Sequence, residues 1–215
     1  NYENHRFDAV IAVGEHATGF VGRNRKVFTG APPVVFYGAS RGIMTPSNAT
    51  GVIGELDLTG TIDLAATLDP RLRHVFVVGG ADSNDRSLQG IAELQLRRFE
   101  PALEITYWLG LRTSDLEDRL RRMPPHSMVF YLVVGQDGAG QFFHPLQYLE
   151  RVAAAANAPV YTWVDSAMGL GVVGGSLKSQ TAQMQVVADT ALRVLRGEPP
   201  PRSAPTSRMQ ASCSG

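Results

Sequence analysis

Short apolar runs rich in Val, Ile and Phe alternate along this chain with longer stretches whose apolar residues recur at helical spacing. Continuous runs are typical of parallel strands buried on both faces, whereas apolar residues three or four positions apart indicate one face of a helix. The runs predict strands at residues 7–13, 33–37, 75–78, 103–109, 128–134 and 160–164. Helices are expected after the first strand as far as residue 28, and at residues 58–68, 88–99, 114–123, 145–156 and 180–195. This alternation predicts an α/β fold built on parallel sheets.

Local signals refine this pattern. Ser114 and Glu117 have the spacing of a capping box at the start of one helix, and Pro145 suits the first turn of another. The strand at residues 103–109 alternates more than the others, which places it near a sheet edge. Residues 200–215 have the composition of a linker or tail, so we expect them to lie outside the fold.

Two passages interrupt the alternation of strands and helices. Residues 41–54 contain Pro, Ser, Asn, Thr and Gly without helical spacing, and residues 158–178 continue from a strand into a glycine-rich run. Both passages are candidate crossings between two lobes. We therefore expect a first lobe of residues 1–51 with 172–199, and a second lobe of residues 52–171. The candidate hinge residues are Thr50, Gly51, Gly169 and Gly171.

Composition narrows the range of functions. The 215 residues are 44% hydrophobic and 19% charged, which is sufficient for one large domain or two small lobes. Basic and acidic residues number 20 each, so no excess of positive charge favours nucleic acid as a partner. A single cysteine, Cys213, excludes an internal disulfide and argues against structural zinc, and we expect no cofactor and no metal. No apolar run reaches the roughly 18 residues that a membrane span needs.

Two motifs point toward other functions. Residues 169–174 match G-x-G-x-x-G, but a dinucleotide fingerprint requires a helix that opens within it, and the next helix is expected near Gln180. Residues 38–42 match G-x-S-x-G after a predicted strand, so a serine hydrolase with Ser40 as nucleophile is an alternative. A nucleophile elbow needs a helix directly after the serine, and residues 43–46 are a poor helix start. The candidate bases are His126 and His144, with Asp82 or Asp137 as the orienting carboxylate.

Polar or aromatic residues follow most of the predicted strands. Because open α/β sheets bind ligands at the carboxyl ends of their strands, these residues are candidates for one site. They are Glu15, His16, Tyr37, Ser40, Asp82, Trp108, Gln136, Asp137, Trp163 and Asp165. Several have a structural alternative, since Asp82 suits a helix cap, Trp108 a core position, and Asp137 with Gly138 a turn.

Several segments in order resemble the type I periplasmic-binding-protein fold. The most specific are DGAG at 137–140, APVY at 158–161, and the passage from GVVGG at 171–175 to RVLRGE at 193–198. The likeness covers nearly everything before the tail, and it is greatest to ABC transporter solute-binding proteins and to extracytoplasmic sensor domains of membrane histidine kinases. The resemblance implies two Rossmann-like lobes. One or two strand–helix units that precede the first strand in this family have no counterpart here, so we expect a first lobe truncated at its N-terminus.

The resemblance also implies a non-catalytic module whose lobes close on a small solute by a hinge motion. The expected ligand contacts are Glu15, His16, Tyr37 and Ser40 from the first lobe, and Asp82, Gln136, Asp137, Trp163 and Asp165 from the second. Trp163 or Tyr37 would stack on the ligand, and Asp165 would accept hydrogen bonds from it. No cationic cluster occurs in this set, which argues against a strongly anionic ligand.

The implied location is periplasmic or otherwise extracytoplasmic. The implied partners are a small-molecule ligand and either a membrane transporter or the transmembrane kinase region of the same protein. A homodimer is also compatible with the sequence, and a dimerising scaffold without a ligand is the structural alternative.

Overall fold

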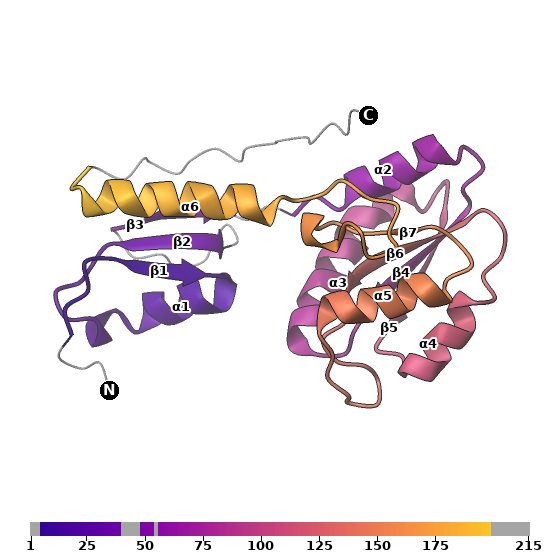
Figure 1. The fold of residues 1–215 in the computed structure, drawn as a ribbon, viewed down its shortest axis with the longest axis horizontal. Coiled ribbons are helices and arrows are strands. Elements are labelled where there is room, and N and C mark those ends of the chain that lie inside the picture. Colours follow the sequence, from indigo (N-terminus) through magenta and orange to yellow (C-terminus); the bar gives the residue numbers. More distant parts are fainter. Residues whose placement is uncertain (1–4, 40–47, 54–55, 199–215) are drawn as a thin grey trace. The chain divides into compact units, whose positions relative to one another are not determined.

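The computed structural model describes residues 5–39, 48–53 and 56–198 (Figure 1). Its contacts divide the chain into two compact units: unit 1 combines Asn1–Leu56 with Ser179–Met209, and unit 2 spans Asp57–Lys178. Each unit has a parallel sheet of its own, which confirms the predicted α/β class with two Rossmann-like lobes. The second unit begins at residue 57 and ends at residue 178, a few residues later at each end than the sequence suggests.

Unit 1 is a three-stranded sheet with one α-helix on each face. Its elements are β1 (Val10–Val13), α1 (Glu15–Arg23), the 3-10 turn η1 (Arg25–Val27), β2 (Val34–Ala39), β3 (Ala49–Ile53) and α6 (Gln180–Leu195). β2 lies in the centre and pairs with β1 and β3 in parallel. Val34 and Phe36 pack with Val21 of α1, while Val35 packs with Val187 of α6, because successive strand residues point to opposite faces. Figure 1 shows α1 and α6 on opposite sides of this sheet.

The third strand of unit 1 corrects an expectation. The sequence assigns residues 41–54 to a crossing and Thr50 with Gly51 to a hinge, but both residues lie in β3, paired with Val35 and Phe36 of β2. A Cβ on Gly51 would overlap the backbone of Phe36, so this glycine serves close strand packing. The segment has no continuous apolar run. Pairing with β2 and contact with α6 stabilise it as a strand, and neither interaction can be predicted from the sequence of the segment itself.

Unit 2 is a four-stranded parallel sheet in the order β5-β4-β6-β7. Its elements are α2 (Thr59–Leu68), β4 (His74–Gly79), α3 (Ser83–Leu96), η2 (Arg97–Phe99), β5 (Glu104–Leu109), α4 (Thr113–Leu120), β6 (Ser127–Val133), α5 (Pro145–Ala155), β7 (Val160–Tyr161) and η3 (Asp165–Ala167). β5 lies at the edge, as its alternating sequence predicts. Pro145 occupies the first turn of α5, also as predicted.

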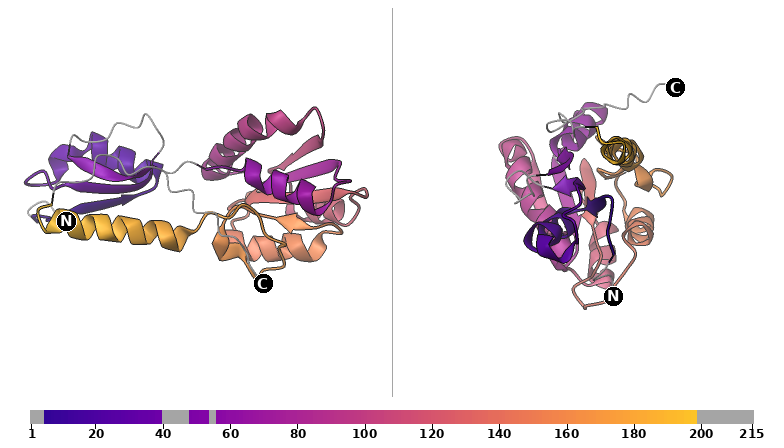
Figure 2. Two further views of the ribbon diagram at one scale, coloured as in Figure 1. Left: turned by 90° about the horizontal axis from the view of Figure 1, so that it is seen from above. Right: turned by 90° about the vertical axis from the view of Figure 1, so that its left-hand side faces the viewer.

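Both faces of the unit 2 sheet are covered. Phe76 and Val129 belong to a core that includes Leu149 of α5 and Leu120 of α4. The alternate residues of β4, such as Val75, are fully buried and point to the other face. Figures 1 and 2 show α3 and α5 on opposite sides of this sheet. Burial on two faces explains why these strands read as continuous apolar runs.

The last strand and the glycine run differ from expectation. β7 is only two residues long instead of the predicted 160–164, because after Tyr161 the chain pairs with residues 173–178. The N–H of Thr162 donates to Gly174 O, and a Cβ on Gly175 would overlap the carbonyl oxygen of Thr162. No helix opens in the run before α6, which confirms that it is not a dinucleotide fingerprint. Gly169 and Gly171, the other hinge candidates, lie within unit 2.

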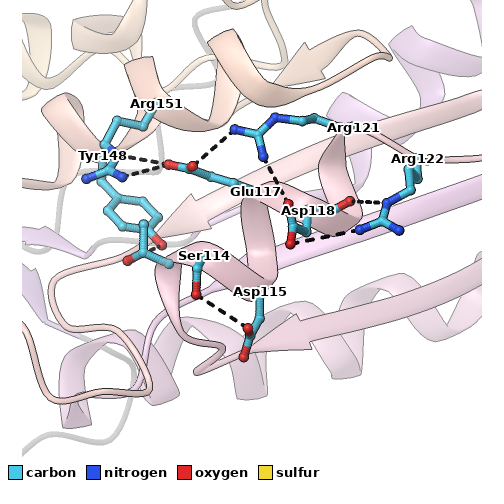
Figure 3. A network of polar contacts seen from close by, with 9 residues as sticks. Ser114, Asp115, Glu117, Asp118, Arg121, Arg122, Tyr148 and Arg151 are labelled. Atoms are coloured by element: carbon cyan, nitrogen blue, oxygen red, sulfur yellow. Dashed lines mark hydrogen bonds and ion pairs between the residues drawn. The ribbon is translucent and has the colours of Figure 1, made fainter.

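The start of α4 also corrects an expectation. Ser114 and Glu117 do not form a capping box: the hydroxyl of Ser114 donates to Asp115, and Glu117 accepts from Arg151 at 2.7 Å (Figure 3). The helix begins at Thr113, whose N–H donates to the carboxylate of Asp137 in the loop after β6. A side chain distant in sequence therefore supplies the acceptor that the local motif was expected to provide.

Candidate functional site

The loops at the carboxyl edge of the unit 2 sheet form the candidate site. β4 continues through α3 to β5 on one side, whereas β6 continues through α5 to β7 on the other side. The strand order therefore reverses between β4 and β6, and open α/β sheets bind ligands at such a switch point. The loops involved are residues 80–82 after β4 and residues 134–144 after β6.

The gap between these two loops is bridged by the chain itself. The Asp85 carboxylate, in the first turn of α3, accepts from the N–H of Gly135 at 3.0 Å and of Gln136 at 3.3 Å. The N–H of Ala81 donates to Gln136 O at 2.7 Å. Asp85 is 1% exposed, and this burial raises its pKa, although the two backbone donors act in the opposite direction. A Cβ on Gly80 would overlap this carboxylate, so glycine is required there.

Asp137 serves the structure of its own loop. Its carboxylate is buried and accepts from Thr113 Oγ1 at 2.7 Å, from Ala139 N at 2.9 Å and from Gln141 N at 3.0 Å. Burial alone would raise the pKa of this carboxyl, but the hydrogen bonds outweigh burial, so its pKa is lowered. Asp137 was expected at the ligand, and the structure gives its oxygens protein partners instead.

Three further candidates are used by the fold. Asp82 is the N-cap of α3 and accepts from the N–H of Asp85 at 2.8 Å, which is the structural alternative that the sequence offered. Gln136 Nε2 donates to Gly140 O at 3.1 Å within its own loop. Trp108 is buried and stacks on Phe76 with ring centroids 4.3 Å apart, so it is a core residue.

Trp163 and Asp165 follow β7 at the same edge of the sheet. Trp163 is half-buried, and its Nε1 donates to Leu132 O at 2.8 Å, which fixes the orientation of the indole ring. Asp165 is half-buried and begins η3, and its N–H donates to Lys178 O at 3.3 Å. Burial lowers the pKa of Lys178.

A pocket of about 360 Å³ opens at the carboxyl ends of β4 and β5. Its lining residues are Gly80, Ala81, Arg86, Gln89, Leu109, Gly110 and Gly138. The sequence pointed to the strand ends but not to Arg86 and Gln89, which come from α3. Their sequence position could have indicated them, because both lie in the first two turns of a helix that starts directly after a strand. Such turns lie beside the carboxyl edge of the sheet, where ligands bind.

The unit 1 candidates lie at the corresponding edge of their own sheet. Glu15 and His16 begin α1 directly after β1, and the side chain of His16 is exposed. Tyr37 lies near the end of β2 and packs partly against the core that α6 covers. Ser40, the nucleophile of the hydrolase alternative, lies outside the described residues.

The remaining groups of the hydrolase alternative are dispersed. His126 precedes β6 at the amino edge of the sheet, with Nδ1 3.6 Å from Asp69, whereas Asp82 and Asp137 lie at the carboxyl edge. His144 is the N-cap residue of α5. Among the residues that the structure describes, neither histidine has a hydrogen bond to either predicted orienting carboxylate, so no triad geometry is formed.

No group of three or more His, Cys, Asp or Glu side chains is arranged to hold a metal ion within residues 5–39, 48–53 and 56–198. In the same ranges, no helix combines the length and the apolar character that a bilayer crossing requires.

Comparison with known proteins places the fold. No family model matches the sequence, and no curated protein matches it significantly. A conserved domain protein from Vibrio cholerae matches 90% of this chain with a TM-score of 0.58 and 16% sequence identity. An ABC domain from Streptococcus pneumonia in complex with L-Trp also matches 90% of this chain, with a TM-score of 0.60 and 14% sequence identity. A sugar ABC transport system substrate-binding protein from Bordetella parapertussis matches 94% of this chain with a TM-score of 0.50 and 18% sequence identity. This chain spans 65% of the length of each. The likeness is one of fold, that of the type I periplasmic binding proteins.

Proposed function

We propose that this chain, with its type I periplasmic-binding-protein fold, is a non-catalytic small-molecule binding module whose two units close on a solute. The observation that carries the proposal is the carboxyl edge of the unit 2 sheet. There the loops after β4, β5 and β6 surround a pocket of about 360 Å³, which is within the range of small-molecule sites. The groups beside it are held by internal hydrogen bonds, which supports a site that needs little rearrangement to receive a ligand.

The structural neighbours support this class of function. One is a substrate-binding protein of a sugar ABC transport system, and another is an ABC domain in complex with L-Trp. By analogy, this chain delivers a solute to an ABC transporter in an extracytoplasmic compartment. A sensor domain of a membrane histidine kinase that closes on a solute in the same way is the second form of the proposal.

Trp163 and Asp165 are the proposed contacts from the loop after β7. The bond from Trp163 Nε1 to Leu132 O orients the indole, and a half-buried ring can stack on an apolar face of a ligand. Asp165 would accept hydrogen bonds from the solute. From unit 1, the proposed contacts are Glu15, His16, Tyr37 and Ser40.

A thermal-shift screen of sugars, amino acids and small organic acids tests the proposal. A ligand that binds the folded state alone must raise the unfolding temperature, so at least one compound should stabilise the chain in a concentration-dependent way. If no compound does so at millimolar concentration, the proposed function is wrong.

The double variant Trp163→Ala with Asp165→Ala tests the proposed contacts. It should lose most of the ligand-dependent shift, whereas Leu94→Ala with Asp118→Ala, at exposed positions on α3 and α4, should keep it. A shift that survives in the first variant would exclude the loop after β7 from the site while leaving the binding function intact.

A further inference from the structure

The pocket at the ends of β4 and β5 has one charged side chain in its lining, Arg86. We propose that Arg86 anchors an anionic group of the solute, a carboxylate or a phosphate, in this pocket. The inference rests on the proposed function and names the class of ligand. It also reverses the expectation drawn from the strand-end residues alone, which contain no cationic cluster and so argued against a strongly anionic ligand.

The backbone donors of the pocket wall are already used by the fold. The N–H of Gly80 donates to Val133 O at 2.9 Å, that of Gly110 to Gly79 O at 2.9 Å, and that of Gly138 to Leu111 O at 2.9 Å. An oxyanion entering the pocket therefore cannot rely on these backbone donors. A side-chain donor has to receive it, and Arg86 is the cationic one in the lining.

One nitrogen of Arg86, an exposed side chain in the first turn of α3, bonds the guanidinium group to the loop after β4. Nε donates to Ala81 O at 3.1 Å, so the side chain lies back against the loop after β4. Within the described part of the chain, its two terminal nitrogens have no hydrogen-bond partner. Two parallel N–H donors on a planar, permanently charged group match the geometry of carboxylate and phosphate oxygens.

The carboxylates on the adjoining loops are engaged by protein donors. Asp82 accepts from the N–H of Asp85, Asp85 from Gly135 and Gln136, and Asp137 from Thr113 and its own loop. None of these three aspartates forms an ion pair with Arg86 in the described structure.

The rest of the lining limits the ligand to a small molecule. Gly80, Ala81, Gly110 and Gly138 contribute little side-chain volume. The Cβ positions of Gly80 and Gly138 are occupied by the Asp85 carboxylate and by the backbone of Gly110, so these two glycines let the pocket wall pack closely. Gln89 is held by a 2.6 Å bond from Nε2 to Gly80 O, and Leu109 adds one apolar side chain. This lining suits a compact, polar anion rather than a large ring system.

Matched pairs of ligands test the inference. The chain is screened by thermal shift with carboxylates beside their amides, and with phosphate monoesters beside their alcohols. The anionic member of at least one pair should stabilise the chain more than its neutral partner. The series in which this preference occurs identifies the anion as carboxylate or phosphate.

Calorimetric titration of the best pair then tests Arg86 itself. Arg86→Gln should weaken binding of the anionic member by about tenfold or more and leave the neutral member unchanged, since a hydrogen bond to a charged group is lost. Arg86→Lys should retain part of the affinity. The control Arg122→Gln removes an exposed arginine just before β6, at the opposite edge of the sheet, and should bind as the unmodified chain does.

The outcomes separate this inference from the proposed function. Neutral members that bind as tightly as anions, or an Arg86→Gln variant that binds the anion as tightly as the unmodified chain does, would overturn the anionic site while solute binding stands. If no member of any pair stabilises the chain although a compound of the broader screen does, the anionic site fails and the proposed function stands. If no compound in either set stabilises the chain, both proposals fail. Circular dichroism of Arg86→Gln establishes that a loss of binding is not a loss of folding.

Discussion

Asp85 and Asp137, on neighbouring elements of unit 2, have pKa values shifted in opposite directions. For Asp85, burial dominates and raises the pKa, so this residue contributes most to stability at low pH and less as pH rises through its raised folded value. For Asp137, hydrogen bonds from Thr113, Gln141 and Ala139 outweigh burial and lower the pKa. Its contribution is fully present above about pH 4, the unfolded value, and is lost as pH falls through the lower folded value.

Asp137→Asn should therefore reduce the free energy of unfolding at pH 7 by about 1–3 kcal/mol, because charge-assisted bonds to Thr113 and to the loop are lost. The difference between this variant and the unmodified chain should shrink as pH falls below about 4. Urea unfolding between pH 3 and pH 7 measures both effects. Asp115→Asn, at an exposed position in α4, should change stability by less than about 0.5 kcal/mol, and equal effects of the two variants would contradict the assignment.

The N-terminus of a helix can be capped by a residue next to it in sequence or by a residue from another segment, and unit 2 has an example of each. α3 has a local cap, in which Asp82 accepts from the N–H three residues further on. α4 has the sequence of a capping box, yet its first N–H donates to Asp137 from another loop. The same kind of sequence signal was therefore right for one helix and wrong for the other.

Asp82→Ala should lower the free energy of unfolding by about 1 kcal/mol, as the loss of an N-cap usually does. Asp82→Asn should keep most of this stability, because an amide oxygen also accepts from the helix N–H. Ser114→Ala should be nearly neutral, since its hydroxyl bonds only to Asp115. Thermal or urea unfolding of the three variants measures these changes. A larger loss of unfolding free energy for Ser114→Ala than for Asp82→Ala would contradict the assignment of the caps.

At the scale of the molecule, the two units differ in how the chain builds them. Unit 2 is one continuous segment with its own core, whereas unit 1 combines the start of the chain with α6. A fragment of residues 57–178 should therefore fold alone, and a fragment that ends at residue 56 should not, because Val35 would lose its cover from α6.

Circular dichroism and urea unfolding of the 57–178 fragment test this prediction. The fragment should show a cooperative transition, and Leu149→Ala should lower its free energy of unfolding by about 2–5 kcal/mol, since this side chain is fully buried. A fragment without a cooperative transition would show that unit 2 depends on unit 1.

The sequence accounted well for the strands of unit 2 and for its helices. Burial on both faces requires uninterrupted apolar residues, so the apolar runs in the sequence were sufficient to predict β4 and β6. β3 was missed because its pairing with β2 and its cover from α6 come from residues far away in the chain. β7 was drawn too long because the partner of residues 162–164 is the glycine passage, which carries no strand signal.

The sequence by itself determined the location of the candidate site, because the polar residues that follow parallel strands lie at one edge of the sheet. It did not determine what those residues do. Whether Asp85 and Asp137 face a ligand or serve the backbone depends on which donors the fold brings to them. Gly135 donates to Asp85 from the loop after β6, and Thr113 donates to Asp137 from the start of α4, so both donors belong to other segments. The position of Arg86 in a pocket likewise depends on how α3 packs beside β5. Tertiary structure alone decided these points, since hydrogen bonds and burial between distant segments leave no periodic trace in the sequence.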